Sequence, residues 1–194
     1  MGAICLRQGA DAHARRLAGA ERDALNLIDQ LGLPVLPTWP VLDMFPAAHP
    51  NLVGPFGTHG TRYANYALQN ADFVLTIGAR LDTREAGSPY QDFARGAKKI
   101  VVDVDPAELN KLPKFGMQVD LLVKADAKQF IRALIDRIKD LPKLRIEEWY
   151  RQIHDWKTRY PICPQDYRTE VSVNPYVFVE ALSEASRPGE LIAV

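Results

Sequence analysis

Residues 54–87, GPFGTHGTRYANYALQNADFVLTIGARLDTREAG, combine a glycine-rich loop, an expected helix, a buried strand and a polar loop. Thr61 is a plausible N-cap, because apolar residues recur behind it at helical spacing. Residues 73–77, FVLTI, form an apolar run of strand length, which is typical of a strand covered on both faces. Gly78 ends this run, and a charged loop follows it. Since open parallel sheets bind ligands beyond the carboxyl ends of their strands, this stretch also predicts where a ligand would lie.

The loop before the expected helix is a candidate anion site, because the backbone N–H groups at a helix start can donate to a phosphate. Its candidate residues are Gly57, Thr58, His59, Gly60 and Thr61. The alternative is a flexible turn, since the glycines recur every three residues and do not form the G-x-G-x-x-G fingerprint. No second His or Cys stands near His59 at ligand spacing, so we expect hydrogen bonding there rather than metal binding.

The polar loop after the strand adds cationic side chains to this candidate site. Arg80 and Arg84 can hold a phosphate or stack on a flat ring, with Asp82 orienting one guanidinium. The alternative is ordinary surface charge. Asp103 and Asp105 end another buried run, where an acid commonly accepts ribose hydroxyls. For Asp105 the alternative is N-capping of the helix that follows.

The rest of the chain alternates apolar runs with amphipathic stretches, which predicts an α/β fold with a Rossmann-like, doubly wound parallel sheet of about six strands flanked by helices. The expected strands are residues 3–6, 33–37, 73–77, 99–105, 118–123 and 191–194. The expected helices are residues 11–31, 61–72, 106–111, 126–138, 144–160 and 174–182, and the last two form a helical C-terminal extension. Residues 40–60 hold four prolines and three glycines, so we expect an irregular loop. A strand at 191–194 would have no sheet to join, which suggests that the chain is part of something longer.

Composition excludes some partners and indicates a compartment. The 194 residues carry 24 Lys and Arg against 24 Asp and Glu, so there is no basic excess for binding nucleic acid or a membrane surface. No apolar run approaches the roughly 18 residues of a membrane span. Cys5 and Cys163 stand far apart and outside any C-x-x-C motif, which favours a reduced cytoplasmic protein.

Nothing in the sequence indicates a complete catalytic apparatus. We find no serine nucleophile elbow, no metal-binding motif and no phosphate-loop lysine. Close His–Asp and Cys–His patterns are lacking as well. The candidate residues therefore predict binding rather than catalysis.

Several short motifs follow one another along the chain, and their order and spacing are typical of one protein family. They are Gly32-Leu33-Pro34-Val35 with Thr38-Trp39, His49-Pro50, residues 57–61 with Ala64-Asn65, Ala71-Asp72, residues 78–84 with Gly87, and residues 100–111, IVVDVDPAELNK. In this order and spacing, the chain resembles the central domain of thiamine-diphosphate-dependent enzymes of the acetolactate synthase, or acetohydroxyacid synthase, type. The resemblance covers most of residues 3–138.

The resemblance implies a domain plan and a set of ligand contacts. It implies a nucleotide-binding domain at residues 1–140, a helical linker at 141–172 and the truncated start of a diphosphate-binding domain at 173–194. It also implies that FAD or an ADP-like nucleotide contacts Thr38, Gly57, Thr58, His59, Gly60, Thr61, Arg80, Asp82, Arg84, Asp103 and Asp105. Arg7-Gln8-Gly9 replaces the glycine-rich turn that flavin-containing members have after the first strand, so ADP or another nucleotide stays open beside FAD.

The same resemblance implies the chemistry of a larger protein. Thiamine diphosphate and Mg²⁺ would bind to flanking domains outside this chain, and the parent would decarboxylate a 2-oxo acid and join the product to an acceptor. The chain alone would be inactive, with a nucleotide-binding or scaffolding role, and a homo-oligomer is expected. The alternatives are a related thiamine-diphosphate decarboxylase and a non-catalytic nucleotide-binding or sensing module. A deacylase of the sirtuin type has a similar fold, but the chain lacks its zinc cysteines.

Overall fold

The computed structural model describes residues 1–6, 19–142, 144–187 and 189–190. The chain divides into two compact units, Met1–Trp156 and Lys157–Val194. The first unit contains the sheet and the candidate site, and the second contains a helical segment. No helix in the described part of the chain is long and apolar enough to cross a membrane.

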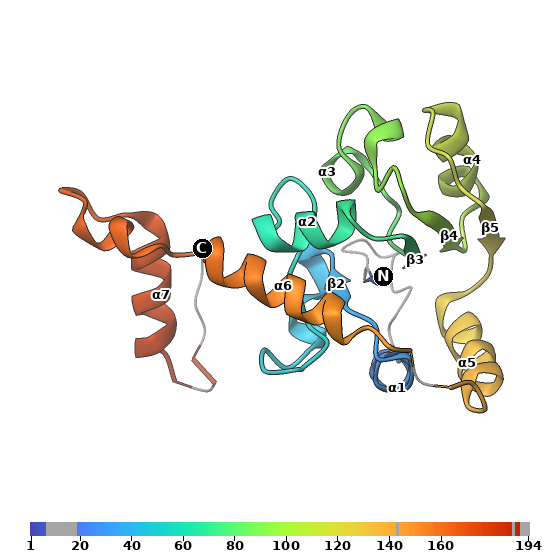
Figure 1. Ribbon diagram of the computed structural model, residues 1–194, viewed down its shortest axis with the longest axis horizontal. Helices are drawn as coiled ribbons and strands as arrows, with labels where there is room; N and C mark the ends of the chain where they lie inside the picture. The colour runs from blue at the N-terminus through green and yellow to red at the C-terminus, as the bar shows by residue number, and fades with distance from the viewer. Residues whose placement is uncertain (7–18, 143, 188, 191–194) are drawn as a thin grey trace. The chain divides into compact units, whose positions relative to one another are not determined.

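The described part of the first unit is built on a five-stranded parallel sheet (Figure 1). Its strands are β1 (Gly2–Leu6), β2 (Val35–Pro37), β3 (Phe73–Ile77), β4 (Lys98–Asp103) and β5 (Leu121–Lys124), in the spatial order β2-β1-β3-β4-β5. Within β1, Ile4 aligns with Val35 of β2 on one side and with Leu75 of β3 on the other. The α/β class and the parallel sheet are thus confirmed, while the expected strand at 191–194 lies outside the described residues.

Helices connect and cover these strands. They are α1 (Glu21–Leu31), α2 (Arg62–Gln69), α3 (Thr83–Ala86), α4 (Pro106–Lys114), α5 (Ala127–Ile138) and α6 (Glu147–Arg159). Short 3₁₀ helices are η1 (Trp39–Met44) and η2 (Tyr90–Asp92), so part of the expected irregular loop at 40–60 is helical. Of the predicted helix at 11–31, residues 21–31 are confirmed as α1. Gly19 and Ala20 are not helical, and residues 11–18 lie outside the described part.

Capping residues explain where several helices begin and end. Thr61 Oγ1 accepts from the Ala64 N–H at 3.3 Å, and Asp126 Oδ1 accepts from the Gln129 N–H at 3.0 Å. At the end of α1, Gly32 adopts φ 63°, the left-handed conformation that glycine takes most readily. The cap at Thr61 confirms the sequence-based prediction for that position.

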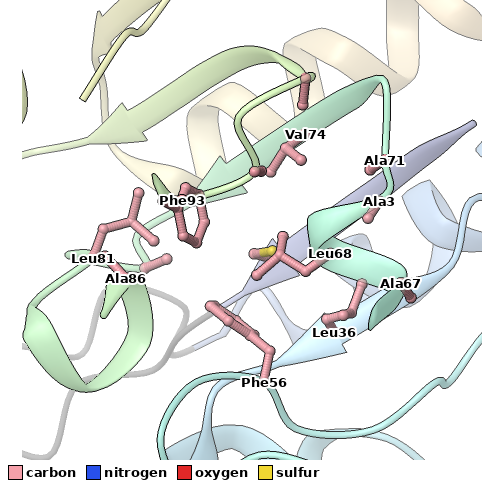
Figure 2. Packing of buried hydrophobic residues seen from close by; sticks show 14 of the residues in the cluster. Ala3, Leu36, Phe56, Ala67, Leu68, Ala71, Val74, Leu81, Ala86 and Phe93 are labelled. Atoms are coloured by element: carbon pink, nitrogen blue, oxygen red, sulfur yellow. The ribbon is translucent and has the colours of Figure 1, made fainter. Parts of the chain in front are cut away.

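Two hydrophobic cores lie on opposite faces of the sheet. Side chains of α2, α3, α4 and α6 pack in one core, and side chains of α1 and α5 pack in the other. Figure 2 shows the first core, in which Leu68 of α2 and Val74 of β3 point toward the same interior as Phe56, Leu81 and Phe93 from loops. The rings of Phe56 and Phe93 lie 6.5 Å apart. Loops near the candidate site are therefore anchored in the core by their own apolar residues.

The second unit is helical, as predicted for the C-terminal segment. It contains η3 (Gln165–Thr169) and α7 (Pro175–Ala185). Asn174 Oδ1 caps α7 through the Tyr176 N–H at 2.9 Å, and the rings of Tyr167 and Tyr176 lie 5.8 Å apart. Arg168 pairs with Glu180, which joins the two helical elements.

Candidate functional site

The strand order creates a switch point between β1 and β3. From β1 the chain first moves to β2 on one side, and β3, β4 and β5 then follow on the other side. Loops beyond the carboxyl ends of the strands diverge at such a point, and open α/β sheets bind ligands in the crevice that results. We call this side of the first unit the carboxyl edge.

Every predicted contact residue lies at the carboxyl edge. Thr38 directly follows β2, residues 57–61 precede α2, and residues 80–84 follow β3. Asp103 is the last residue of β4, and Asp105 follows it by two positions. The fold therefore brings all four predicted segments to the same side of the sheet.

Hydrogen bonds join the glycine-rich loop to its neighbours. The Gly57 N–H donates to Asn65 Oδ1 at 2.8 Å, and Asn65 Nδ2 donates back to Gly57 O at 3.0 Å. The Thr58 N–H donates to Arg84 O at 2.7 Å. A Cβ at Gly57 would contact that same carbonyl oxygen, so only glycine permits this close approach. The loop at 57–61 and the loop at 80–84 are therefore one connected surface.

The backbone of this loop is largely engaged within the protein. Besides the bonds of Gly57 and Thr58, the Gly60 N–H donates to Gly57 O at 3.0 Å and the Thr61 N–H donates to Pro55 O at 2.9 Å. A phosphate at this edge would consequently depend more on cationic side chains than the sequence suggested. The two arginines become the principal candidates.

The loop after β3 alternates buried and outward residues in an unusual backbone conformation. Ala79 and Leu81 are buried, whereas Arg80 and Arg84 are exposed. Arg80 and Leu81 both have positive φ, 58° and 47°, a conformation that costs non-glycine residues free energy and often marks functional sites. Burial of Leu81 thus holds Arg80 in a defined position on the carboxyl edge.

Glu108 on α4 holds the first arginine. Arg80 Nε donates to Glu108 Oε1 at 3.1 Å, and Lys111 Nζ donates to Glu108 Oε2 at 2.5 Å. Arg84 is exposed, and no hydrogen bond or ion pair of its side chain is seen within the described part of the chain. Asp82 Oδ1 accepts from the Arg84 N–H at 2.8 Å and caps α3.

The two predicted ribose acids hold local structure. Asp105 Oδ1 accepts from the Ala107 N–H at 2.8 Å, which confirms the N-cap alternative for Asp105. Asp103 is buried, and its Oδ1 accepts from the Asp105 N–H at 2.9 Å. Both carboxylates therefore shape the turn from β4 into α4, whatever else they bind.

Thr38 is completely buried beyond β2, and its Oγ1 has no hydrogen-bond partner among the described residues. A buried hydroxyl without a partner costs free energy, so this atom marks a position that a ligand could satisfy. Next to it, the ring of the exposed Trp39 lies 6.3 Å from the ring of His59. The end of β2 is thereby connected to the glycine-rich loop.

Sequence reasoning missed three supporting residues: Asn65, Tyr90 and Glu108. Asn65 was noted only within a motif, and its two bonds to Gly57 depend on a helix packing against a loop. Burial raises the pKa of Tyr90, and the charges of Asp82, Glu108 and Glu85 raise it further. The spacing of Glu108 and Lys111 on a helix was a usable signal, because residues three apart lie side by side.

No group of three or more His, Cys, Asp or Glu side chains in the described ranges is arranged to hold a metal ion. Mg²⁺ prefers several oxygen ligands. The described residues therefore do not fit a metal–diphosphate site. The carboxyl edge fits an anionic ligand held by arginine.

Comparison with known proteins gives a consistent result. Residues 10–134 match the family described as "Thiamine pyrophosphate enzyme, central domain". The chain is 37% identical over 139 residues to the acetolactate synthase isozyme 1 large subunit of Escherichia coli (strain K12), covering 72% of this chain and 23% of that protein.

Two further relatives give similar values. The chain is 33% identical over 168 residues to a probable acetolactate synthase large subunit of Methanocaldococcus jannaschii, covering 87% of this chain and 27% of that protein. It is 30% identical over 167 residues to an acetolactate synthase large subunit of Cyanidium caldarium, covering 80% of this chain and 28% of that protein. The chain thus spans about a quarter of the length of these relatives.

Proposed function

Because the chain belongs to the central-domain family of thiamine pyrophosphate enzymes, we propose that it is the middle domain of an acetolactate synthase-like enzyme and binds a nucleotide at its carboxyl edge. The ligand is the adenosine diphosphate group that FAD and ADP share. Arg80 and Arg84 contact its phosphates, and the loop at 57–61 lies against it.

One observation carries this proposal: the bond from the Thr58 N–H to Arg84 O, which joins the glycine-rich loop to the arginine loop. It places a cationic rim directly beside the switch point of the sheet. Arginine suits phosphate because its planar guanidinium donates two parallel hydrogen bonds. The orphaned Thr38 hydroxyl is a further donor for the same ligand.

The domain plan and the parent's chemistry extend this proposal. Residues 1–140 form the nucleotide-binding domain, 141–172 a linker, and 173–194 the beginning of a diphosphate-binding domain. Bound to flanking domains, thiamine diphosphate supplies an electron sink for 2-oxo acid decarboxylation and ligation. This chain contributes binding and orientation, acts in a homo-oligomer in the cytoplasm, and has no activity alone.

A scaffolding role is the second candidate, and α7 favours it. Tyr176, Phe178 and Val179 are each more than half exposed on this helix. Large apolar side chains gathered on one short helix suit contact with another protein surface. Scaffolding and nucleotide binding involve different units of the chain and are compatible.

Isothermal titration of the purified chain with ADP tests the nucleotide site. Arg84→Ala should weaken binding by roughly 1–3 kcal/mol, the scale of a lost charged hydrogen bond. Arg95→Ala is the matched control, because Arg95 is an exposed arginine just before β4, at the opposite end of the strands. Equal affinity of wild type and Arg84→Ala would refute the contact at this arginine.

An absorbance scan of the purified chain separates the two ligands. A flavin band indicates that FAD is retained, whereas an adenine band released on denaturation indicates ADP. A chain that retains neither and gives no heat with either compound would refute the nucleotide site. Scaffolding would then remain as the proposed function of this chain.

A further inference from the structure

We infer that Glu108 is a positioning residue for the anion site: it holds Arg80 through Nε and so directs the two terminal guanidinium nitrogens to one phosphate. The inference rests on the proposed nucleotide site and deepens it. Glu108 itself does not contact the ligand, since a carboxylate beside a phosphate would repel it.

The first step of the argument is the way in which Glu108 is held. It lies in the first turn of α4, which Asp105 caps and Pro106 begins. Its side chain is only 15% exposed, and each carboxylate oxygen accepts from one cation, Arg80 on one side and Lys111 on the other. A carboxylate fixed in this way has little freedom to release Arg80.

The second step concerns the geometry that Arg80 retains. Among the described residues, its only hydrogen bond is the one from Nε to Glu108 Oε1. The terminal nitrogens therefore keep their donors for a bidentate contact, the form in which arginine binds phosphate most specifically. Fixing a long side chain before the ligand arrives also reduces the conformational entropy lost on binding.

The third step concerns the backbone under Arg80. Arg80 and Leu81 are held at positive φ, and Leu81 is fully buried. Strain of this kind persists only where the surroundings determine the conformation. The buried Leu81 fixes the backbone and Glu108 fixes the guanidinium, so that both ends of the Arg80 side chain are constrained.

The sign of one substitution separates positioning from simple electrostatics. Glu108→Gln removes a negative charge from the anion site, and electrostatics alone would make ADP bind more tightly. Loss of positioning has the opposite effect, because Arg80 becomes mobile. We therefore expect Glu108→Gln to weaken ADP binding about 10-fold, as expected for a lost charge-assisted contact.

A double-mutant cycle measured by titration with ADP completes the test. If Glu108 acts through Arg80, Glu108→Gln should change affinity less than about 2-fold in an Arg80→Ala background. Glu148→Gln is the matched control, since Glu148 is an exposed glutamate on α6. Thermal unfolding of every variant checks that the fold is retained, and the isosteric Gln makes this the expected outcome.

The arginine Nε–H signal in ¹H–¹⁵N spectra reports the hydrogen bond between Arg80 and Glu108 in the absence of nucleotide. We expect one signal that is slow to exchange in wild type, disappears in Arg80→Lys and loses its protection in Glu108→Gln. Tighter binding by Glu108→Gln, or equal weakening with and without Arg80, would overturn the inference while leaving the nucleotide site in place. A wild-type chain that does not bind ADP would instead overturn the proposed function, and the inference with it.

Discussion

The two edges of the sheet differ in what their side chains do. At the carboxyl edge, Arg80 projects from a backbone at positive φ, and the Thr38 hydroxyl is buried without a partner among the described residues. The opposite side of the first unit, at the amino ends of the strands, is called the amino edge here. It borders a cavity of about 410 Å³ with an almost wholly apolar lining, which includes Leu31 of α1 and Leu134 of α5. The carboxyl edge therefore carries polar groups in constrained conformations, and the amino edge carries apolar groups beside empty space.

This difference separates the requirements of binding from those of folding. Strained backbone and unsatisfied polar atoms each cost free energy, so they persist only where neighbouring residues enforce them. An apolar cavity also costs free energy, because its lining lacks contacts on one side. Substitutions that change side-chain size should consequently lower the free energy of unfolding strongly at the carboxyl edge and only slightly at the amino edge.

The largest expected effect is at Gly57. Gly57→Ala should destabilise the fold by roughly 4 kcal/mol, because the new Cβ combines a positive φ with direct contact to Arg84 O. Gly87→Ala is the control, since Gly87 also has positive φ, 78°, but has open space around it. Its cost should be about 1–2 kcal/mol, the backbone contribution alone. Urea unfolding measures both, and equal costs would mean that the loop at 57–61 can move away from Arg84.

Two leucines on the α1–α5 face provide the next comparison. Leu27→Ala should cost roughly 3 kcal/mol, because Leu27 is fully buried in a packed core. Leu134→Ala should cost about 1 kcal/mol, since Leu134 is only partly buried and already borders the cavity. Chemical denaturation of both variants provides the measurement. A cost at Leu134 as large as that at Leu27 would show that the cavity is filled in solution.

The sequence predicted the fold well because its signals were local. Apolar runs marked the strands, and the helices expected from 61 and from 126 begin within one residue of those positions. The strand expected from 118 begins only at Leu121, directly after Asp120, whose N–H donates to Lys99 O of β4 at 3.0 Å. Such a boundary depends on a tertiary hydrogen bond, which periodicity does not contain.

The candidate site was predicted less completely, for the same reason. The position of the predicted residues at the carboxyl edge followed from strand ends alone. The N–H groups of the loop at 57–61 donate to other parts of the protein, and Glu108 binds Arg80, which is 28 positions away in the sequence. Both interactions depend on how two loops and a helix pack together. Residue types in a motif indicate which side chains gather, and packing decides which of them are already engaged.

Tyr150 offers a smaller effect with a pH signature, at the ends of α1 and α6. Its hydroxyl donates to Gly32 O at 3.0 Å and accepts from Asn51 Nδ2 at 2.6 Å. Tyr150→Phe should cost about 1–2 kcal/mol through these lost bonds. Burial raises the pKa of Tyr150 to about 12, although the hydrogen bond from Asn51 lowers this pKa in part.

The pH dependence of Tyr150→Phe follows from the direction of that shift. Between pH 10 and 12 the unfolded chain loses the Tyr150 proton first, so the stability that this group contributes is complete below pH 10 and falls as pH rises through the interval. The variant lacks this contribution, and its alkaline decline in unfolding free energy should be shallower. Parallel curves for the two proteins from pH 9 to 12 would show that the hydroxyl is solvated.

The smallest effect compares two buried threonine hydroxyls. Thr76, the fourth of the five residues of β3, and Thr38, directly after β2, both lack a hydrogen-bond partner for Oγ1 among the described residues. Valine keeps the shape and removes the unsatisfied group, so each Thr→Val change should stabilise the fold by about 0.5–1 kcal/mol. Thr38 lies beyond the end of its strand, whereas Thr76 lies within β3, so only Thr38→Val should also weaken ADP binding. Equal ADP affinity for both variants would make Thr38 a second structural threonine and would move the ligand away from the end of β2.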